Sequence, residues 1–146
     1  MTTVAEPCRK VFGAVADLDT YPQWFTIVDR AVAAPADEPT WDVDLAARAG
    51  PFKRTKRVRM VQVHASLEDG HVRYERQEAD GRPHSAWVLE AHVAPAAVDG
   101  ATDLRVRLHY DGIAWVPGLD LLLRQEARRA GTRLAVFLAK DPGGSG

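Results

Sequence analysis

Three polar residues share the parity of the apolar positions around them, so they could bring acid–base chemistry to an apolar face. Glu126 lies within a helical stripe, Arg76 lies in a strand, and Ser85 faces Arg76 if a tight turn joins their strands. A carboxylate in an apolar cavity acquires a raised pKa suited to proton transfer, and an adjacent arginine can orient an enolate. Tyr110 is a further catalytic candidate, because its phenol brings a polar group to the same face. In the alternative, Glu126 lies at the edge of the stripe and pairs with solvent or a neighbouring arginine.

The histidines have no metal-binding spacing. The five histidines are His64, His71, His84, His92 and His109. No two of them form an H-x-H or an H-x-x-x-H pair. The one cysteine, Cys8, is distant in the sequence. A G-x-S-x-G nucleophile elbow and a glycine-rich phosphate loop before a helix are also missing from the sequence. The sequence therefore predicts no metal and no cofactor.

The composition is that of one ordinary soluble domain. The chain has 146 residues, of which 46% are apolar and 27% charged, and its net charge is −1. This charge gives no general attraction to nucleic acid, and no run approaches the ~20 apolar residues of a membrane helix. A single cysteine excludes an intrachain disulfide and fits a reducing compartment, and no secretory signal begins the chain. We expect one domain over residues 1–140, a flexible glycine-rich tail over 141–146, and a cytoplasmic protein without stable membrane insertion.

A long amphipathic helix between about residues 118 and 140 must position Glu126. Its apolar residues recur at spacings of three and four, and they include Leu119, Leu122, Leu123, Ala127, Ala130, Leu134, Phe137 and Leu138. The middle of the stripe is small, with Ala127, Ala130 and Gly131, while both ends are bulky. Small side chains leave volume unfilled, so we expect this helix to cover a cavity against a sheet.

Short elements and then strands precede that helix. Residues 2–5 predict at most a short strand, Pro7 suits the first turn of a helix, and Pro22 suits a second short helix capped by Asp19 or Thr20. Alternating apolar residues then predict strands near 28–32, 41–47 and 55–64. In the last of these the apolar parity changes after Met60, so either both faces are covered or a bulge shifts the register.

Turns and pairing place the next three strands. The Asp80-Gly81 dipeptide predicts a two-residue hairpin, which sets Tyr74 opposite Trp87, Val72 opposite Leu89, and Arg76 opposite Ser85. A second register pairs Trp87 with Tyr110, Leu89 with Leu108, Ala91 with Val106, Val93 with Leu104, and Glu90 with Arg107. Because apolar residues meet on one face and opposite charges on the other, this register is self-consistent. It places His92 and His109 on the outer face.

The element order is that of an α+β domain with a one-sided antiparallel sheet and a long C-terminal helix. Particular residues add a resemblance: Pro7 to Phe12, the run from Val15 to Trp24 with its Tyr-Pro and Trp, and Gly50-Pro51-Phe52 before a basic strand. Together with the final helix, they resemble the START-like (Bet v 1-like, helix-grip) superfamily. Within it, the chain is most similar to the bacterial polyketide cyclase/dehydrase branch.

The resemblance implies a curved antiparallel sheet of six or seven strands wrapped around the C-terminal helix, with two short helices after the first strand and an apolar cavity inside. Members of the superfamily bind lipids, sterols, polyketides or plant hormones, and a minority are aromatases and cyclases. The fold alone does not choose among these activities. One departure is the first strand, which is shorter here than is usual in the family and would leave an incomplete sheet edge.

Three functions stay open. We expect a monomer or homodimer that binds a hydrophobic or amphipathic small molecule, with no nucleic-acid partner. The alternatives are a polyketide cyclase, aromatase or dehydratase that uses the same cavity, and a protein-interaction module that uses the basic strand 53–59. The expected ligand-binding residues are Trp41, Val43, Val58, Met60, Tyr74, Trp87, Leu89, Val106, Leu108, Tyr110, Leu123, Glu126, Ala127, Ala130 and Leu134. For each of the apolar and aromatic ones, the alternative is simple packing in a solid core.

Overall fold

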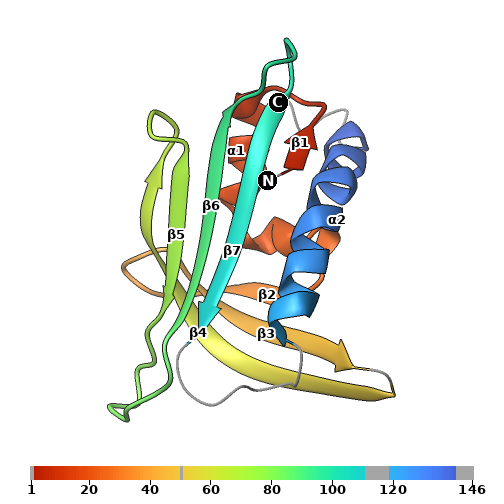
Figure 1. Cartoon of the computed structure of the whole chain (residues 1–146). Helices are drawn as coiled ribbons and strands as arrows, with labels where there is room; N and C mark the ends of the chain where they lie inside the picture. The colour runs from red at the N-terminus through yellow and green to blue at the C-terminus, as the bar shows by residue number, and fades with distance from the viewer. Residues whose placement is uncertain (1, 50, 111–118, 141–146) are drawn as a thin grey trace.

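The computed structural model describes residues 2–49, 51–110 and 119–140, without the side chains at 48, 49, 52 and 119–123. The tail predicted over residues 141–146 lies outside the described residues. The helices are α1 (Cys8–Val15), the 3-10 helix η1 (Leu18–Gln23) and α2 (Leu119–Ala139). The strands are β1 (Thr2–Val4), β2 (Val28–Ala34), β3 (Thr40–Ala49), β4 (Phe52–Ser66), β5 (His71–Arg76), β6 (Trp87–Pro95) and β7 (Thr102–Tyr110) (Figure 1).

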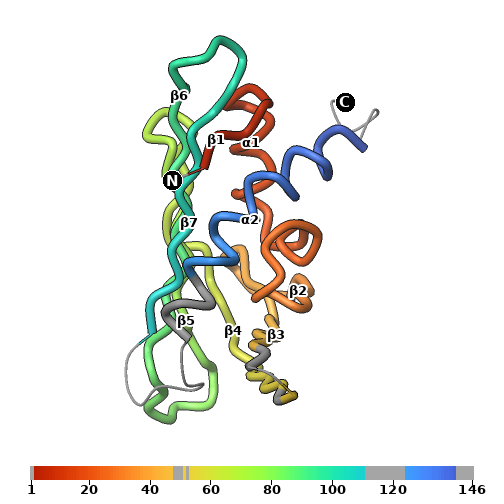
Figure 2. Tube along the Cα trace, turned by 45° about the vertical axis from the view of Figure 1, so that its right-hand side comes forward, coloured from red at the N-terminus to blue at the C-terminus, as the bar shows by residue number. Residues whose placement is uncertain are grey.

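The strands form one seven-stranded antiparallel sheet in the order β1-β7-β6-β5-β4-β3-β2. The sheet is curved, and α1, η1 and α2 lie on the same side of it (Figures 1 and 2). Buried side chains alternate along the strands, as Trp87, Leu89, Ala91 and Val93 do in β6. One face of the sheet is therefore apolar and is covered by the helices. This is the predicted α+β helix-grip fold.

The pairing of β6 with β7 has all the predicted partners. The prediction for β5 and β6 is wrong, because Tyr74 lies opposite Leu89 rather than Trp87, and Val72 lies opposite Ala91 rather than Leu89. A shift of two residues leaves every side chain on the same face of the sheet. The predicted inner and outer faces are therefore confirmed, although these strand partners are not.

A longer loop explains the shift. Residues 77–86 connect β5 to β6, so the Asp80-Gly81 dipeptide does not form the predicted two-residue hairpin, although Gly81 has the positive φ of 72° that such a turn needs. Arg76 closes the base of the loop, because its guanidinium donates to Glu78 at 2.9 Å and to Ser85 Oγ at 3.3 Å. The side chains of Arg76 and Ser85 therefore meet, while the backbone of Arg76 pairs with β4.

Both alternatives for the parity change in β4 apply. This strand covers Phe52–Ser66, which is longer than the predicted 55–64. Its register against β5 shifts between Gln62 and His64, as a bulge requires. Val61 is also buried although its neighbour Met60 is buried on the inner face, whereas Val63 is 42% exposed.

The two short helices differ from the prediction at their first residues. Pro7 precedes α1 as its N-cap instead of occupying the first turn. Asp17, rather than Asp19 or Thr20, caps η1, because its Oδ1 accepts a hydrogen bond from the backbone N–H of Asp19 at 3.1 Å. The buried Trp24 therefore follows η1 and does not form one of its faces.

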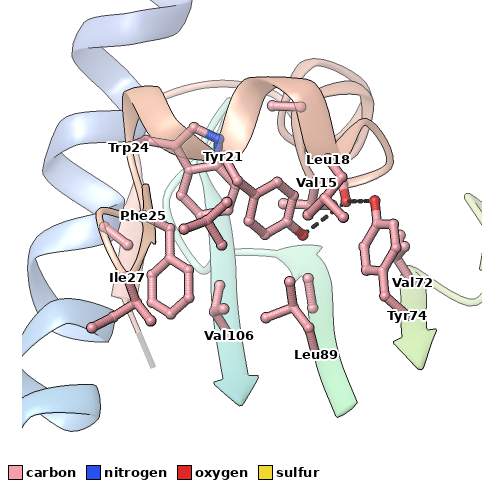
Figure 3. Close-up of a cluster of buried hydrophobic side chains, with 14 of the residues drawn as sticks. Val15, Leu18, Tyr21, Trp24, Phe25, Ile27, Val72, Tyr74, Leu89 and Val106 are labelled. Atoms are coloured by element: carbon pink, nitrogen blue, oxygen red, sulfur yellow. Dashed lines mark hydrogen bonds between the residues drawn. The ribbon is translucent and has the colours of Figure 1, made fainter. Parts of the chain in front are cut away.

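Aromatic side chains from η1, from the residue that follows it and from β5 fill one end of the inner face (Figure 3). Tyr21, Trp24 and Tyr74 are fully buried, and the ring centroids of Tyr21 lie 4.4 Å from Trp24 and 5.9 Å from Tyr74. Both tyrosine hydroxyls donate to the backbone oxygen of Val15, at 2.8 and 2.7 Å. Burial raises the pKa of both phenols above its ordinary value. Two hydrogen bonds thus join the end of α1 to η1 and to the sheet.

The small residues in the middle of α2 have a packing role that the sequence pattern does not indicate. A Cβ atom on Gly131 would lie 1.9 Å from Cγ2 of Thr2, so only glycine allows β1 to approach the helix this closely. The hydroxyl of Thr2 also donates to the backbone oxygen of Ala127 at 3.4 Å. At Gly131, therefore, the small side chain makes room for a strand and not for a cavity.

Candidate ligand-binding site

A pocket of about 270 Å³ lies between β7 and α2. Apolar and basic residues line it, and they are Phe25, Val106, Arg107, Leu108, His109, Arg124 and Ala127. Three of these, Val106, Leu108 and Ala127, belong to the predicted ligand-binding set. Phe25 and the three basic residues do not, because strand parity assigns Arg107 and His109 to the outer face.

The short first strand explains why residues from both faces of β7 reach one pocket. β1 pairs only with Thr102, Asp103 and Leu104 of β7. In the described part of the chain, β7 beyond Leu104 has β6 on one side and no paired strand on the other. Side chains of both parities can reach the opening along such an edge. The incomplete sheet edge predicted from the short first strand is confirmed.

The remaining inner-face candidates lie in the packed core. Trp41, Val43, Val58, Met60, Tyr74, Trp87, Leu89, Ala130 and Leu134 are buried, and Leu108 and Tyr110 pack against them while partly exposed. Two of the polar groups among these residues already have partners in the chain, since Tyr74 donates to Val15 and Trp41 Nε1 donates to Asp19 Oδ1 at 2.6 Å. Tyr110 stacks on Trp87 with ring centroids 5.3 Å apart. The side chain of Leu123 lies outside the described residues.

Glu126 is buried and paired. Only 7% of the residue is exposed, and its Oε2 accepts hydrogen bonds from the hydroxyl of Thr26 at 2.5 Å and from the guanidinium of Arg133 at 2.6 Å. Arg129 lies 3.8 Å from the other carboxylate oxygen. This arrangement corresponds to the alternative in which Glu126 pairs with a neighbouring arginine. It joins α2 to the segment between η1 and β2.

Arg76 and Glu126 are not brought together as an acid–base pair. The contacts of Arg76 are Glu78, His84 and Ser85, all in the loop 77–86. Within residues that the structure describes, it shares no contact with Glu126. The predicted cooperation of these two side chains therefore has no geometric support.

The basic strand 53–59 is partly neutralised. Arg57 donates to Asp44 on the neighbouring strand at 2.8 Å, and this hydrogen bond lowers the pKa of Asp44 below its ordinary value. Lys53 and Arg54 are exposed near the end of the β3–β4 hairpin. At least part of this basic run is therefore solvent-exposed and paired with an acidic residue of the neighbouring strand.

One group of described residues could hold a metal ion. His71, Glu90 and His92 lie on the outer face of the sheet, and their ligand atoms are within 4.8 Å of one another. The sequence prediction of no metal site does not anticipate this group, because its members have no motif spacing and come from two strands.

A sequence profile of the family described as polyketide cyclase / dehydrase and lipid transport matches residues 2–136. The chain belongs to this family. The predicted branch of the START-like superfamily is thereby confirmed, and this family member has the expected sheet and C-terminal helix. A search of curated proteins gave no match. Among the described residues, no helix is both long enough and apolar enough to cross a membrane.

Solved structures with the same fold are similar to this family member at low sequence identity. The Zhui aromatase/cyclase from Streptomyces sp. R1128 aligns with 99% of this chain and 93% of its own, at 14% identity and a TM-score of 0.64. Ara h 8.0201 aligns with 94% of this chain and 93% of its own, at 16% identity and a TM-score of 0.59. The di-domain ARO/CYC StfQ from the steffimycin biosynthetic pathway aligns with 95% of this chain but 42% of its own, at 21% identity and a TM-score of 0.54. Identities this low support the fold alone.

Proposed function

We propose that this family member binds a hydrophobic or amphipathic small molecule, lipid-like or polyketide-like, at the opening between β7 and α2. The pocket of about 270 Å³ at the incomplete sheet edge is the observation that carries the proposal. Small-molecule sites typically occupy about 300–1,000 Å³. The pocket therefore suits a small ligand or one end of a longer chain, with the predicted inner-face residues as its deeper neighbours.

The lining favours an amphipathic ligand with an acidic or enolic oxygen. Phe25 and Leu108 offer apolar surface, and an aromatic ring adds a face for stacking. Arg107 and Arg124 stand at the same pocket, and guanidinium groups bind carboxylate and enolate oxygens strongly. A ligand with an apolar body and an anionic end would use both kinds of contact.

The test uses 1-anilinonaphthalene-8-sulfonate, a fluorescent probe with an apolar body and one negative charge. Ala127→Trp should fill the pocket and lower the affinity for the probe at least about tenfold, because Ala127 lines the pocket and is only partly buried. Ala139→Trp, on an exposed position of the same helix, is the matched control and should bind as wild type. Ala130→Trp is less informative, because Ala130 is fully buried in the core.

Two outcomes would count against this placement. Equal probe affinity in Ala127→Trp and wild type would exclude the pocket, provided that near-UV circular dichroism shows both to be folded. Unchanged affinity in Arg124→Gln would exclude the proposed role of the cationic rim. Native mass spectrometry of freshly purified protein, followed by solvent extraction, would identify the chemical class of any retained ligand.

A second candidate function is a cyclase, aromatase or dehydratase acting at the same opening. His109 favours it, because an imidazole beside Arg107 and Arg124 provides a group that can accept a proton next to groups that stabilise an enolate. In such a reaction the base removes a proton next to a carbonyl, and the enolate forms a carbon–carbon bond with a second carbonyl. The resulting alkoxide takes the proton back from the base, and the β-hydroxy ketone then loses water. Turnover of a poly-β-ketone thioester should then fall in His109→Gln while binding survives.

The residues proposed from sequence are tested in the same assay. Tyr110→Phe probes the phenol beside Leu108, and Glu126→Gln and Arg76→Gln probe the other two catalytic candidates. Because Glu126 and Arg76 are engaged with Arg133 and Glu78, we expect their replacement to affect stability more than turnover. Loss of turnover in either variant at unchanged stability would restore them as catalytic candidates.

A further inference from the structure

Three side chains that commonly bind metals meet on the outer face of the sheet, away from α2. His71 of β5 lies directly opposite His92 of β6, and Glu90 lies two residues before His92 on the same face. The rings of His71 and His92 are stacked, with centroids 4.3 Å apart and planes inclined by 7°. Both imidazoles direct Nε2 toward the same carboxylate, that of Glu90.

The distances to Glu90 are those of ligands around one ion. Its Oε2 lies 3.6 Å from Nε2 of His71 and 3.3 Å from Nε2 of His92. Two metal–ligand bonds of about 2.0–2.1 Å at a tetrahedral angle hold their ligand atoms about 3.3–3.4 Å apart. Because the two rings are stacked, both imidazoles must rotate out of this arrangement before their nitrogen lone pairs and the carboxylate meet at one ion.

His71 has an unsatisfied nitrogen at this point. Its Nε2 is shielded from solvent and forms no hydrogen bond with any of the described residues. A buried polar atom without a partner is costly, and a bond to a metal would satisfy it. The neighbouring His64 differs, because its Nε2 lies 3.2 Å from Asp69 Oδ2 and already has a partner.

Arg73 orients the carboxylate. Its Nη1 donates to Glu90 Oε1, and its Nε donates to Glu75 at 2.7 Å, so Oε2 of Glu90 is the oxygen left for the imidazoles. Outer partners of this kind fix the orientation of metal-binding carboxylates. One carboxylate is too few oxygen ligands for hard cations such as Ca²⁺ and Mg²⁺, which bind six or more oxygens. Two imidazole ligands favour a metal of the zinc class instead.

We propose that His71, Glu90 and His92 bind one divalent transition-metal ion, with Zn²⁺ as the best match. Water completes the coordination on the side of His92, the exposed member of the group. The ion connects β5 to β6 on the outer face of the sheet. The proposal thus goes beyond the proposed ligand binding and does not depend on it.

Isothermal titration of Zn²⁺ into metal-free protein tests the site. Wild type should bind one equivalent, and Ca²⁺ at the same concentrations should give no binding. His71→Ala, His92→Ala and Glu90→Gln should each bind at least about tenfold more weakly, since even the loss of an outer partner costs about 10–100-fold. His64→Ala and His109→Ala, on nearby outer-face histidines, are the matched controls and should bind as wild type.

Thermal unfolding gives a second measurement on the same proteins. Zn²⁺ should raise the midpoint of wild type and of both controls, because an ion that binds only the folded state stabilises it. Glu90→Gln, which preserves side-chain size, should stay folded and lose this rise. Absence of Zn²⁺ binding to wild type, or equal weakening in His109→Ala and His71→Ala, would overturn the proposal.

Discussion

At one end of the inner face, aromatic side chains fill the space between the sheet and η1, whereas between β7 and α2 they leave a pocket. The filled end contains Tyr21, Trp24 and Tyr74. All three are fully buried, and the polar group of each donates a hydrogen bond to another residue of the chain. The open end contains the partly buried Leu108 and Tyr110. The difference shows that an inward aromatic residue is weak evidence for a ligand when its polar group already has a partner.

The sheet edge distinguishes the two ends. β1 extends the sheet beside residues 102–104 of β7 and contacts α2 through Thr2 and Gly131. Further along β7, no described strand continues that edge, and the pocket appears there. A short terminal strand thus determines where the inner face is accessible.

The largest expected effect comes from removing a ring at the filled end. Trp24 is fully buried and its Nε1 donates to Thr20, so Trp24→Ala should lower the free energy of unfolding by about 3–5 kcal/mol. Leu108→Ala, at the open end, should cost less than about 2 kcal/mol, because the side chain is only partly buried. It should, however, weaken probe binding. Equal losses of stability in chemical denaturation would contradict the distinction between the two ends.

A smaller effect is expected where β1 meets α2. Gly131→Ala forces Thr2 to move, because the new Cβ would lie 1.9 Å from its Cγ2, and overpacking of this kind costs about 1–3 kcal/mol. Gly13→Ala in α1 is the matched control, since its Cβ would meet nothing within 4 Å, and helical alanine is favoured by up to about 1 kcal/mol. Chemical denaturation measures both, and a stabilised Gly131→Ala would exclude the close approach.

The smallest effect concerns alkaline pH. Burial raises the pKa of Tyr21 and Tyr74 above the unfolded value of about 10. The neutral phenols are therefore favoured in the folded state, and their contribution is complete below about pH 10 and is lost as the pH rises toward the folded pKa. Each hydroxyl bond contributes about 1 kcal/mol. Unfolding at increasing pH should show the decline.

The double variant Tyr21→Phe, Tyr74→Phe tests the assignment. It should be less stable than wild type at pH 7 by about 2 kcal/mol and should lose less stability between pH 9 and 11. Absorbance of the ionised phenols should rise with unfolding in wild type. An identical pH dependence in the two proteins would place the alkaline transition elsewhere.

Local patterns predict much of the fold. Apolar alternation and the Glu90–Arg107 charge pair are sufficient for the register of β6 and β7, because both faces of the pair agree. The β5–β6 register fails because the Asp80-Gly81 dipeptide indicates a tight turn. Arg76 instead holds a longer loop through contacts that only the folded chain provides.

The candidate sites are less predictable from the sequence. They depend on where a neighbouring strand ends and on which side chains lie opposite each other across two strands. Strand parity finds Val106 and Leu108 but assigns Arg107 to the outer face, since parity does not show where a neighbouring strand ends. His71 and His92 have no motif spacing, and only the true register places them directly opposite each other. The two-residue error in the predicted β5–β6 register therefore changed the cross-strand pairs on the outer face more than it changed the set of core residues.

The contact of Thr2 with Gly131 also has a consequence for biosynthesis. α2 is translated after all seven strands, so on the ribosome the apolar inner face has no α2 to cover it until that helix emerges. The docking of α2 then joins residues more than a hundred positions apart, as the Thr2–Ala127 hydrogen bond does with its separation of 125. Contacts this distant in sequence form slowly, and exposed apolar sheet surface is prone to aggregation. The nascent chain is therefore most prone to aggregate just before α2 emerges.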